Sequence, residues 1–171
     1  MERVIVIGCP GAGKSTFARA LRDLSGLPLY YLDQIWHRPD GTNISRPEFD
    51  SQLEHILKQQ RWILDGNYLR TLERRLSYCD TVFLLDLPLQ VCLDGAESRI
   101  GLPREDLPWV EQSFDPEFRQ WIEAFPSEQL PQIYSMLETH GGGKTIFIFR
   151  SREETARYLQ QWGSASKNSE I

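Results

Sequence analysis

Cysteine and histidine are scarce in this sequence of 171 residues, with three of each. The cysteines form no CxxC pair, and the cysteines and histidines together have no zinc-site spacing. No apolar run approaches the roughly 20 residues that a membrane-spanning helix needs, and the N-terminus leads into a short apolar segment instead of a signal peptide. We therefore expect a protein of the reducing cytoplasm with no membrane segment.

Basic residues are also fewer than acidic residues: the chain has 19 Lys and Arg and 24 Asp and Glu, which gives a net charge of −5. Sequence-independent DNA binding depends on many Lys and Arg that neutralise phosphates, so this balance opposes direct DNA binding. The composition favours a small-molecule partner. It contains no signal for the oligomeric state.

Short apolar runs alternate with helical patterns along the chain. Continuous apolar runs, typical of strands buried on both faces, lie at 4–7, 80–87 and 144–149, and shorter ones at 29–32 and 62–64. Helix-start signals lie at Ser45, Asp115 and Ser151. This alternation predicts an α/β three-layer sandwich with about five parallel strands and helices on both faces. We expect one domain over residues 1–163, a helical lid insertion at about 99–140, and a flexible tail at 164–171.

The clearest motif follows the first apolar run. Residues 8–15, GCPGAGKS, match the phosphate-binding P-loop pattern G-x-x-x-x-G-K-[ST]. Glycines let successive backbone N–H groups surround phosphate oxygens, and the start of the next helix adds positive potential. The pattern predicts a P-loop NTPase fold that binds ATP and Mg²⁺, with Lys14 on the phosphates and Ser15 on the metal. The expected nucleotide-binding residues are Gly8, Cys9, Pro10, Gly11, Ala12, Gly13, Lys14, Ser15 and Thr16.

Three acidic residues follow predicted strands, at the sheet edge where ligands of open α/β sheets bind. Asp65 follows WIL and suits the Mg²⁺ side, while Asp33 follows YYL and suits the phosphoryl acceptor. Asp86 lies within LLDLP. The alternative for each is a helix cap or a turn, where Asp is common.

Several of these segments together resemble the adenylate-kinase-related P-loop kinases. Within these kinases, the chain is most similar to the bacterial group called DNA topology modulation protein, or FlaR-related. The resemblance rests on the P-loop, on LD at 32–33 with WHRP at 36–39, on WILDGNY at 62–68 and on DTVFLLDLP at 80–88. It is specific over residues 1–98 and looser beyond them.

The resemblance implies a nucleotide-monophosphate-kinase-like core with Asp65 near Mg²⁺. It also implies lid arginines at Arg99 and Arg104, which would act as catalytic residues with Lys14 and Asp33 by closing over the transferred phosphoryl group. The alternative for both arginines is a surface pair with nearby acids. Adenylate kinases have an arginine four residues after the Asp; here Leu69 holds that place and Arg70 follows.

The acceptor pocket is expected to include Asp33 together with Trp36, Arg38 and Asn67, which follow the strand-end acids; the resemblance adds Arg70. Trp36 has an alternative as a packing residue between helix and sheet. Arg70, Arg74 and Arg75 form a basic helical face, which we interpret as solvated. Arg150 and Ser151 follow the last strand and are candidates for adenine contact, with helix capping as the alternative for Ser151.

The leading hypothesis is a kinase that transfers the γ-phosphoryl group of ATP to a small acceptor, such as a nucleotide or a nucleoside. The second is a nucleotide-dependent regulator linked to DNA topology. The third is a protein that binds ATP without transfer, suggested by the displaced Arg70 and the acidic lid. The sequence identifies neither the acceptor nor the choice of ATP over GTP.

Overall fold

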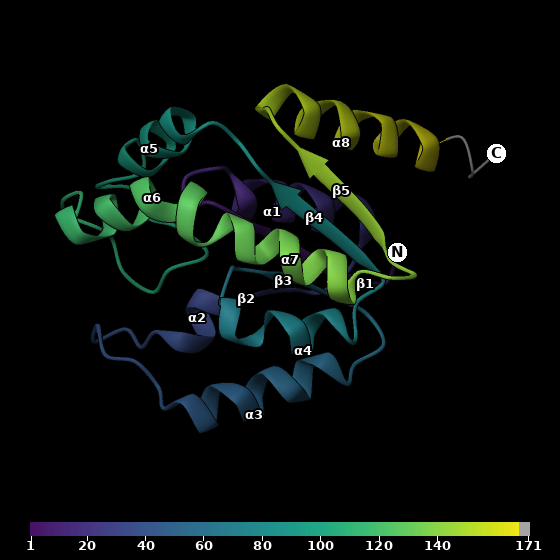
Figure 1. Cartoon of the computed structure of the whole chain (residues 1–171), viewed down its shortest axis with the longest axis horizontal. Helices are drawn as coiled ribbons and strands as arrows, with labels where there is room; N and C mark the ends of the chain where they lie inside the picture. Colours follow the sequence, from purple (N-terminus) through teal and green to yellow (C-terminus); the bar gives the residue numbers. More distant parts are fainter. Residues whose placement is uncertain (168–171) are drawn as a thin grey trace.

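The computed structural model describes residues 1–167, and its centre is one parallel sheet (Figure 1). The strands run in the order β2-β3-β1-β4-β5, and every neighbouring pair is parallel. Their bounds are β1 Arg3–Gly8, β2 Leu29–Tyr31, β3 Trp62–Asp65, β4 Thr81–Leu85 and β5 Thr145–Phe149. Parallel strands need crossover connections, and here each crossover contains helices. The sequence prediction of five parallel strands is confirmed.

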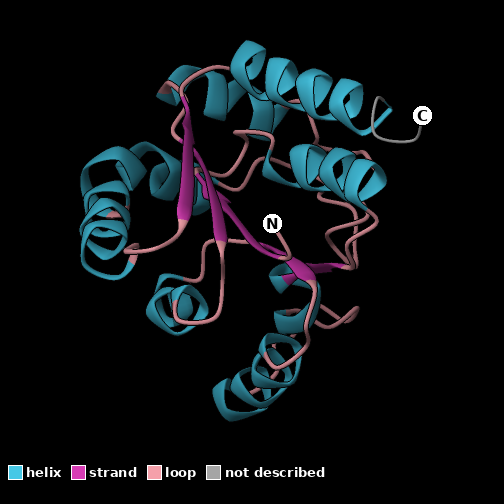
Figure 2. Ribbon diagram, turned by 90° about the vertical axis from the view of Figure 1, so that its right-hand side faces the viewer, coloured by secondary structure: helices cyan, strands magenta, loops and turns pink. Residues whose placement is uncertain are grey.

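Helices cover both faces of the sheet, as Figure 2 shows, so the architecture is a three-layer α/β sandwich. Helices α1 (Lys14–Ser25) and α8 (Arg152–Lys167) pack together on one side, and α4 (Leu72–Leu76) packs against α7 (Leu130–His140) on the other. The remaining helices are α2 (Leu32–Trp36), α3 (Arg46–Leu57), the 3₁₀ turn η1 (Leu69–Thr71), α5 (Leu89–Glu97) and α6 (Pro116–Glu128). None of the helices in residues 1–167 is long and apolar enough to cross a membrane.

The core lies where the strands meet the helices. All residues of β3 and β4 are buried, as are the apolar residues of β1. Their continuous apolar runs therefore reflect burial on both faces. Phe17 of α1, Phe83 of β4 and Phe149 of β5 form an aromatic cluster, in which Phe17 and Phe83 have ring centroids 4.9 Å apart.

Three helices begin at the residues that the sequence predicts. The Ser45 hydroxyl accepts the Glu48 amide, the Asp115 carboxylate accepts the Phe118 amide, and the Ser151 hydroxyl accepts the Glu154 amide. Each cap satisfies one of the amides that a helix leaves free at its start. The contact supports the capping interpretation of Ser151.

The segment expected to be a helical lid is only partly helical. Residues 98–115, which we call the lid loop, contain turns but no helix or strand, and α6 begins after them. Helix α7 buries Ile133 and Leu137 in the core, so this part of the insertion packs on the sheet layer. Helix α8 continues past Gly163 to Lys167, so the expected tail begins as helix. Residues 168–171 of that tail lie outside the described residues.

Candidate functional site

The P-loop connects β1 to α1 and packs tightly against α5. Gly11 has φ 80°, and a Cβ there would lie 1.9 Å from the carbonyl oxygen of Cys92. Gly13 has φ 94° and open space on its Cβ side. Side chains other than glycine rarely adopt such angles, so both positions need glycine for the conformation, and Gly11 also needs it for the close packing. The loop keeps the backbone bare where a ligand can approach.

The start of α1 has uncapped backbone amides next to a lysine. The first-turn amides of this 12-residue helix have no side-chain cap. Uncapped amides and the helix dipole attract phosphate groups. Lys14 lies beside them and donates from Nζ to the Cys9 carbonyl at 3.1 Å. Burial lowers the pKa of Lys14, an effect that the nearby Asp65 partly opposes.

A cavity of about 310 Å³ lies beside the P-loop, at the carboxyl ends of β2 and β3. Its lining comes from four regions: the P-loop, the strand ends, the lid loop and α6. It includes Lys14, Ser15, Asp33, Asp65, Asn67, Tyr68, Leu69, Arg99, Arg104, Asp106, Phe118 and Trp121. The topology therefore brings eight of the predicted site residues to one cavity, namely Pro10, Lys14, Ser15, Asp33, Asp65, Asn67, Arg99 and Arg104.

A second hollow of about 290 Å³ lies on the outer side of the P-loop. It is lined by Gly11, Gly13, Thr16, Arg19, Gly95 and Arg152, among others. Five residues line both spaces, namely Lys14, Ser15, Arg99, Arg104 and Asp106. These five residues therefore stand between the two spaces.

Asp65 is buried with one carboxylate oxygen unpaired. Its side chain is 4% exposed, and Oδ1 has no hydrogen-bond partner. Burial raises the pKa of Asp65 to about 6, although the nearby Lys14 lowers it. A buried carboxylate oxygen without a partner is costly unless a ligand completes it. Carboxylate and hydroxyl oxygens are the ligands that Mg²⁺ prefers, so Asp65 fits such an ion.

Asp106 is a site residue that the sequence analysis missed as a ligand candidate. It is 4% exposed and accepts a hydrogen bond from the Ser15 hydroxyl at 3.2 Å. Burial raises the pKa of Asp106, but the hydrogen bond and charge of Arg104, together with the bond from Ser15 and a backbone bond, more than offset it, so the pKa is lowered. No spacing rule links residues 91 apart, so the sequence contained no signal for this contact. In residues 1–167 no three His, Cys, Asp or Glu side chains gather into a metal site.

Arg99 and Arg104 line the cavity and are also paired with acids, as their alternative interpretation predicts. Arg104 donates to Glu111 at 2.7 Å and to Asp106. Burial lowers the pKa of Arg104, but these carboxylates more than offset it, and the pKa is raised. Arg99 lies 3.7 Å from Glu111, has a buried Nε without a hydrogen bond, and has a pKa lowered by burial and by Arg104.

The turn after β3 is fixed to the P-loop and to α4. The Asn67 side chain accepts from the Gly8 amide at 2.9 Å and donates to the Gly8 carbonyl at 2.6 Å. Arg75 is fully buried and donates to the carbonyls of Gly66, Asn67 and Tyr68. The expectation that Arg75 belongs to a solvated face is therefore wrong. Its burial lowers its pKa to about 9.

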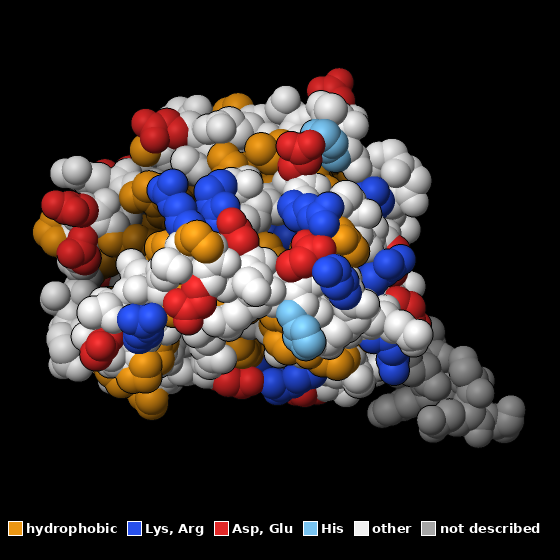
Figure 3. Space-filling view, turned by 90° about the horizontal axis from the view of Figure 1, so that it is seen from below, with side chains coloured by type: hydrophobic (Ala, Val, Ile, Leu, Met, Phe, Trp, Pro, Cys, Tyr) orange, Lys and Arg blue, Asp and Glu red, His pale blue; other side chains and the backbone are white. Residues whose placement is uncertain are grey.

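Three residues expected in the acceptor pocket lie outside the cavity lining. Trp36 packs edge-on against Phe49, as its alternative interpretation predicts. Arg38 lies 3.5 Å from Glu48, and Arg70 forms a two-bond pair with Asp50. The view in Figure 3 shows basic and acidic side chains next to one another on this side of the molecule. Asp33, in contrast, lines the cavity and accepts from the Tyr68 hydroxyl at 2.8 Å.

Asp86 lies away from this cavity. It accepts from the Tyr134 hydroxyl at 2.6 Å and pairs with Arg150 at 3.0 Å. Asp86 and Arg150 line a groove next to Cys9. Through these two contacts Asp86 links the end of β4 to α7 and to the residue that follows β5.

Comparison with known proteins relates the chain to kinases. No protein-family model matches it. Adenylate kinases from Thermotoga petrophila and Thermotoga maritima are each 28% identical to it over 88 residues, which is 50% of this chain and 39% of each relative. The chain thus spans about two fifths of the length of the curated relatives that it matches.

A solved structure covers almost the whole chain. Shikimate kinase from Acinetobacter baumannii, in complex with shikimate, aligns with a TM-score of 0.60 over 96% of this chain and 94% of that one. The sequence identity is 16%, so this likeness shows the fold alone. The fold is the P-loop NTPase α/β sandwich, and together with the adenylate kinase matches it supports a relationship to the P-loop kinases.

Proposed function

We propose that this protein is an ATP- and Mg²⁺-dependent phosphotransferase that acts on a small molecule. One observation carries the proposal. Lys14, Ser15, Arg99, Arg104 and Asp106 line both the hollow over the P-loop and the cavity at the strand ends. Cations placed between donor and acceptor would stabilise the negative charge of a phosphoryl group in transfer.

Each residue has a role that follows from its position. The amides of residues 8–16 and Lys14 would hold the β- and γ-phosphates. The oxygens of Ser15, Asp65 and Asp106 would hold Mg²⁺, which would neutralise phosphate charge. The Asp33 carboxylate would accept the proton of the acceptor hydroxyl. The acceptor oxygen then bonds to the γ-phosphorus, the bond to the bridging oxygen breaks, and ADP leaves.

Two alternatives to this proposal remain: a protein that binds ATP without transfer, and a nucleotide-dependent regulator linked to DNA topology. The paired charges of the lid loop favour a protein that binds ATP without transfer, because Arg104 already has two carboxylate partners. The resemblance to the DNA topology modulation group suggests an indirect regulator in the cytoplasm. The net charge of −5 gives direct duplex binding little support.

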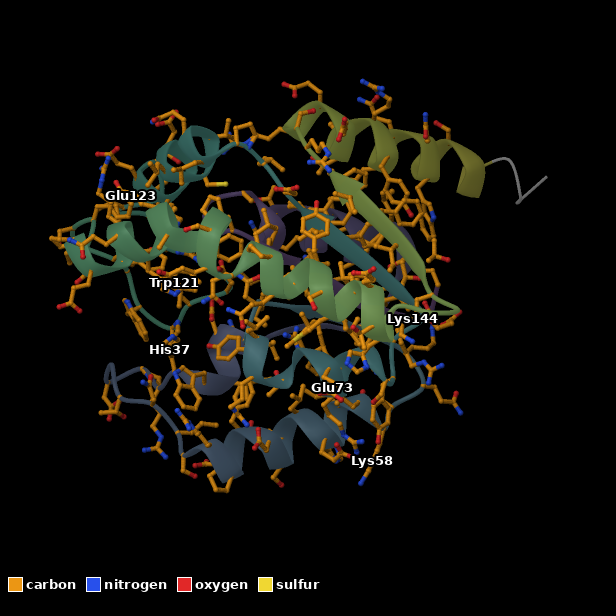
Figure 4. The ribbon with its side chains drawn as sticks, viewed as in Figure 1. His37, Lys58, Glu73, Trp121, Glu123 and Lys144 are labelled. Carbon is orange, nitrogen blue, oxygen red and sulfur yellow. The ribbon has the colours of Figure 1, made fainter. Side chains whose placement is uncertain are left out.

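The test uses γ-labelled ATP, Mg²⁺ and a panel of nucleosides, nucleoside monophosphates and hydroxy acids. We expect Lys14→Ala to lower kcat/KM by about 10²–10³-fold, which is typical of removing one preorganised transition-state donor. Lys58→Ala is the matched control, because Lys58 lies at the C-terminal end of α3, away from Trp121, as Figure 4 shows. We expect it to leave transfer unchanged.

Three results would separate the hypotheses. Full activity in Lys14→Ala would contradict the proposal. Binding of ATP without any labelled product would favour the binder without transfer. A DNA mobility shift that weakens steeply between about 50 and 200 mM salt would favour the regulator.

A further inference from the structure

The charges around the cavity at the strand ends already balance. Its lining contains three cations, Lys14, Arg99 and Arg104, and three carboxylates, Asp33, Asp65 and Asp106, so the formal sum is 3 − 3 = 0. A bound ATP·Mg²⁺ would add a net negative charge. An acceptor that brought its own phosphate would then enter a negative, partly buried space and compete with Asp106 and Glu111 for the two arginines, which is unfavourable.

The three cations also already contact other groups of the protein. Lys14 lies on the P-loop carbonyl of Cys9, where the phosphates of ATP would bind. Arg104 bonds to Glu111 and Asp106, and Arg99 lies 3.7 Å from Glu111. Both arginines line the P-loop hollow as well. Both also line a further hollow with Asp33, Glu111 and Phe118, so they face carboxylates on the acceptor side as well.

The turn after β3 places an apolar side chain in the lining of the cavity. Leu69 lines the cavity, whereas its neighbour Arg70 lies outside the lining and is held by two hydrogen bonds to Asp50, of 3.0 and 2.7 Å. Tyr68, with a positive φ of 35°, begins the 3₁₀ turn that separates the two. The backbone therefore selects leucine over arginine as the group that meets the acceptor.

An aromatic wall closes the same end. Phe118 and Trp121 of α6 both line the cavity, and their rings stack with centroids 6.1 Å apart. Figure 4 shows Trp121 on the side of α6 that faces α2, while Glu123 points the other way. Trp121 remains 37% exposed, so it has surface left for a ligand ring. Opposite it, Asp33 offers a carboxylate to hydroxyl groups.

We infer that the acceptor is a neutral ring compound with hydroxyl groups and with no phosphate or carboxylate of its own. The inference rests on the proposed phosphotransferase function and narrows it. The ring would pack on Phe118, Trp121 and Leu69, and a hydroxyl would lie at Asp33. Nucleosides and cyclic polyols share this chemistry.

Matched pairs of acceptors test the inference. The labelled-ATP assay compares adenosine, cytidine and thymidine with AMP, CMP and dTMP, and compares myo-inositol with shikimate, whose ring bears a carboxylate. We expect at least one neutral probe to accept the label, with a kcat/KM at least about tenfold above that of its charged partner. A labelled nucleoside points to base stacking, and labelled myo-inositol points to the polyol class.

Two outcomes would overturn the inference. Transfer to AMP, CMP or dTMP at a rate equal to or above that of the nucleosides would overturn it and leave the phosphotransferase function standing. Failure of all neutral probes to accept the label would also overturn it. Loss of Lys14-dependent ATP binding would instead overturn the function itself.

Two variants of lining residues should weaken the preference for a neutral acceptor. Leu69→Arg places a cation at the acceptor end, so it should raise the kcat/KM ratio of AMP to adenosine by about tenfold. Leu24→Arg, at an exposed leucine near the end of α1, is the matched control and should leave that ratio unchanged. Trp121→Ala should raise KM for the neutral acceptor without changing ATP affinity, and Trp121→Phe should restore most of the loss. An unchanged AMP-to-adenosine ratio in folded Leu69→Arg would contradict the inference.

Discussion

The turn after β3 and the lid loop both border the cavity, but different kinds of contact hold their polar side chains in place. In the turn, Arg75 and Asn67 bond to backbone groups, and Asp65 keeps a buried oxygen without a partner. In the lid loop, Arg99, Arg104, Asp106 and Glu111 pair mostly with one another across irregular backbone. One region is held by buried hydrogen bonds to the backbone, and the other by ion pairs between side chains that are 6% to 23% exposed.

The difference shows that one site can contain polar side chains with fixed partners and charged side chains that can change partners. Buried bonds to backbone carbonyls are lost only if the turn unfolds, because breaking them leaves polar groups without partners. The pair of Arg99 and Glu111 is the looser one, at 3.7 Å with side chains 23% and 20% exposed, so water and salt compensate part of the charge when it separates. We therefore expect the Asp65 side of the cavity to stay in place while Arg99 can change its partner when phosphates bind.

Removal of Arg75 tests the fixed region and should have the largest effect. Arg75→Leu leaves the carbonyls of Gly66 and Asn67 without their partner inside the protein. We expect the free energy of unfolding to fall by about 3 kcal/mol or more, measured by urea denaturation. Arg74→Leu is the control one residue away, because Arg74 is exposed and pairs with Glu54 at the surface. Equal losses in both variants would contradict the distinction.

Asp65→Asn tests the unpaired carboxylate. The folded pKa of Asp65, about 6, lies above its ordinary value of 3.8, so the folded protein holds the proton more tightly than the unfolded chain does. Ionisation of Asp65 therefore lowers stability progressively as the pH rises from about 4 to about 6. We expect Asp65→Asn to raise the free energy of unfolding at pH 7.5 by up to about 3 kcal/mol, the equivalent of this shift.

The gain should shrink at pH 4, where Asp65 is protonated in the folded wild-type protein. Denaturation curves at the two pH values measure this difference. The same variant should lose Mg²⁺-dependent transfer under the proposed function. A gain that is equal at pH 4 and pH 7.5 would show that Asp65 is not the group that titrates.

Glu111→Gln tests the lid loop and should have the smallest effect. Glu111 pairs with Arg104 at 2.7 Å, but Arg104 keeps Asp106 as a second partner. We expect a change of about 1 kcal/mol or less in the free energy of unfolding, decreasing as salt is added. Denaturation at low and high salt provides the measurement. A salt-independent loss comparable to that of Arg75→Leu would remove the contrast between the two regions.

Local patterns predicted much of this molecule. The five strands were recognisable because buried parallel strands are continuously apolar, and three helix starts because capping depends on residues three apart. The P-loop was recognisable because eight consecutive residues contain the whole phosphate cradle. Asp33 and Asp65 were found from their places at strand ends, and both line the cavity.

Other contacts depend on residues that meet only in the folded chain. Asp106 reaches Ser15 across 91 positions, and no periodicity relates them. Arg70, Arg74 and Arg75 look alike in the sequence, yet Asp50, Glu54 and three backbone carbonyls give them different environments. The placement of Leu69 inside the cavity and Arg70 outside it depends on the left-handed turn at Tyr68.

The sequence by itself determined the sheet, the phosphate cradle and the acids at the strand ends, because each depends on neighbouring residues and their spacing. The tertiary structure decided which charges remain available to a ligand. That decision depends on burial and on partners brought from distant segments, since a side chain's electrostatic role is set by what surrounds it in space.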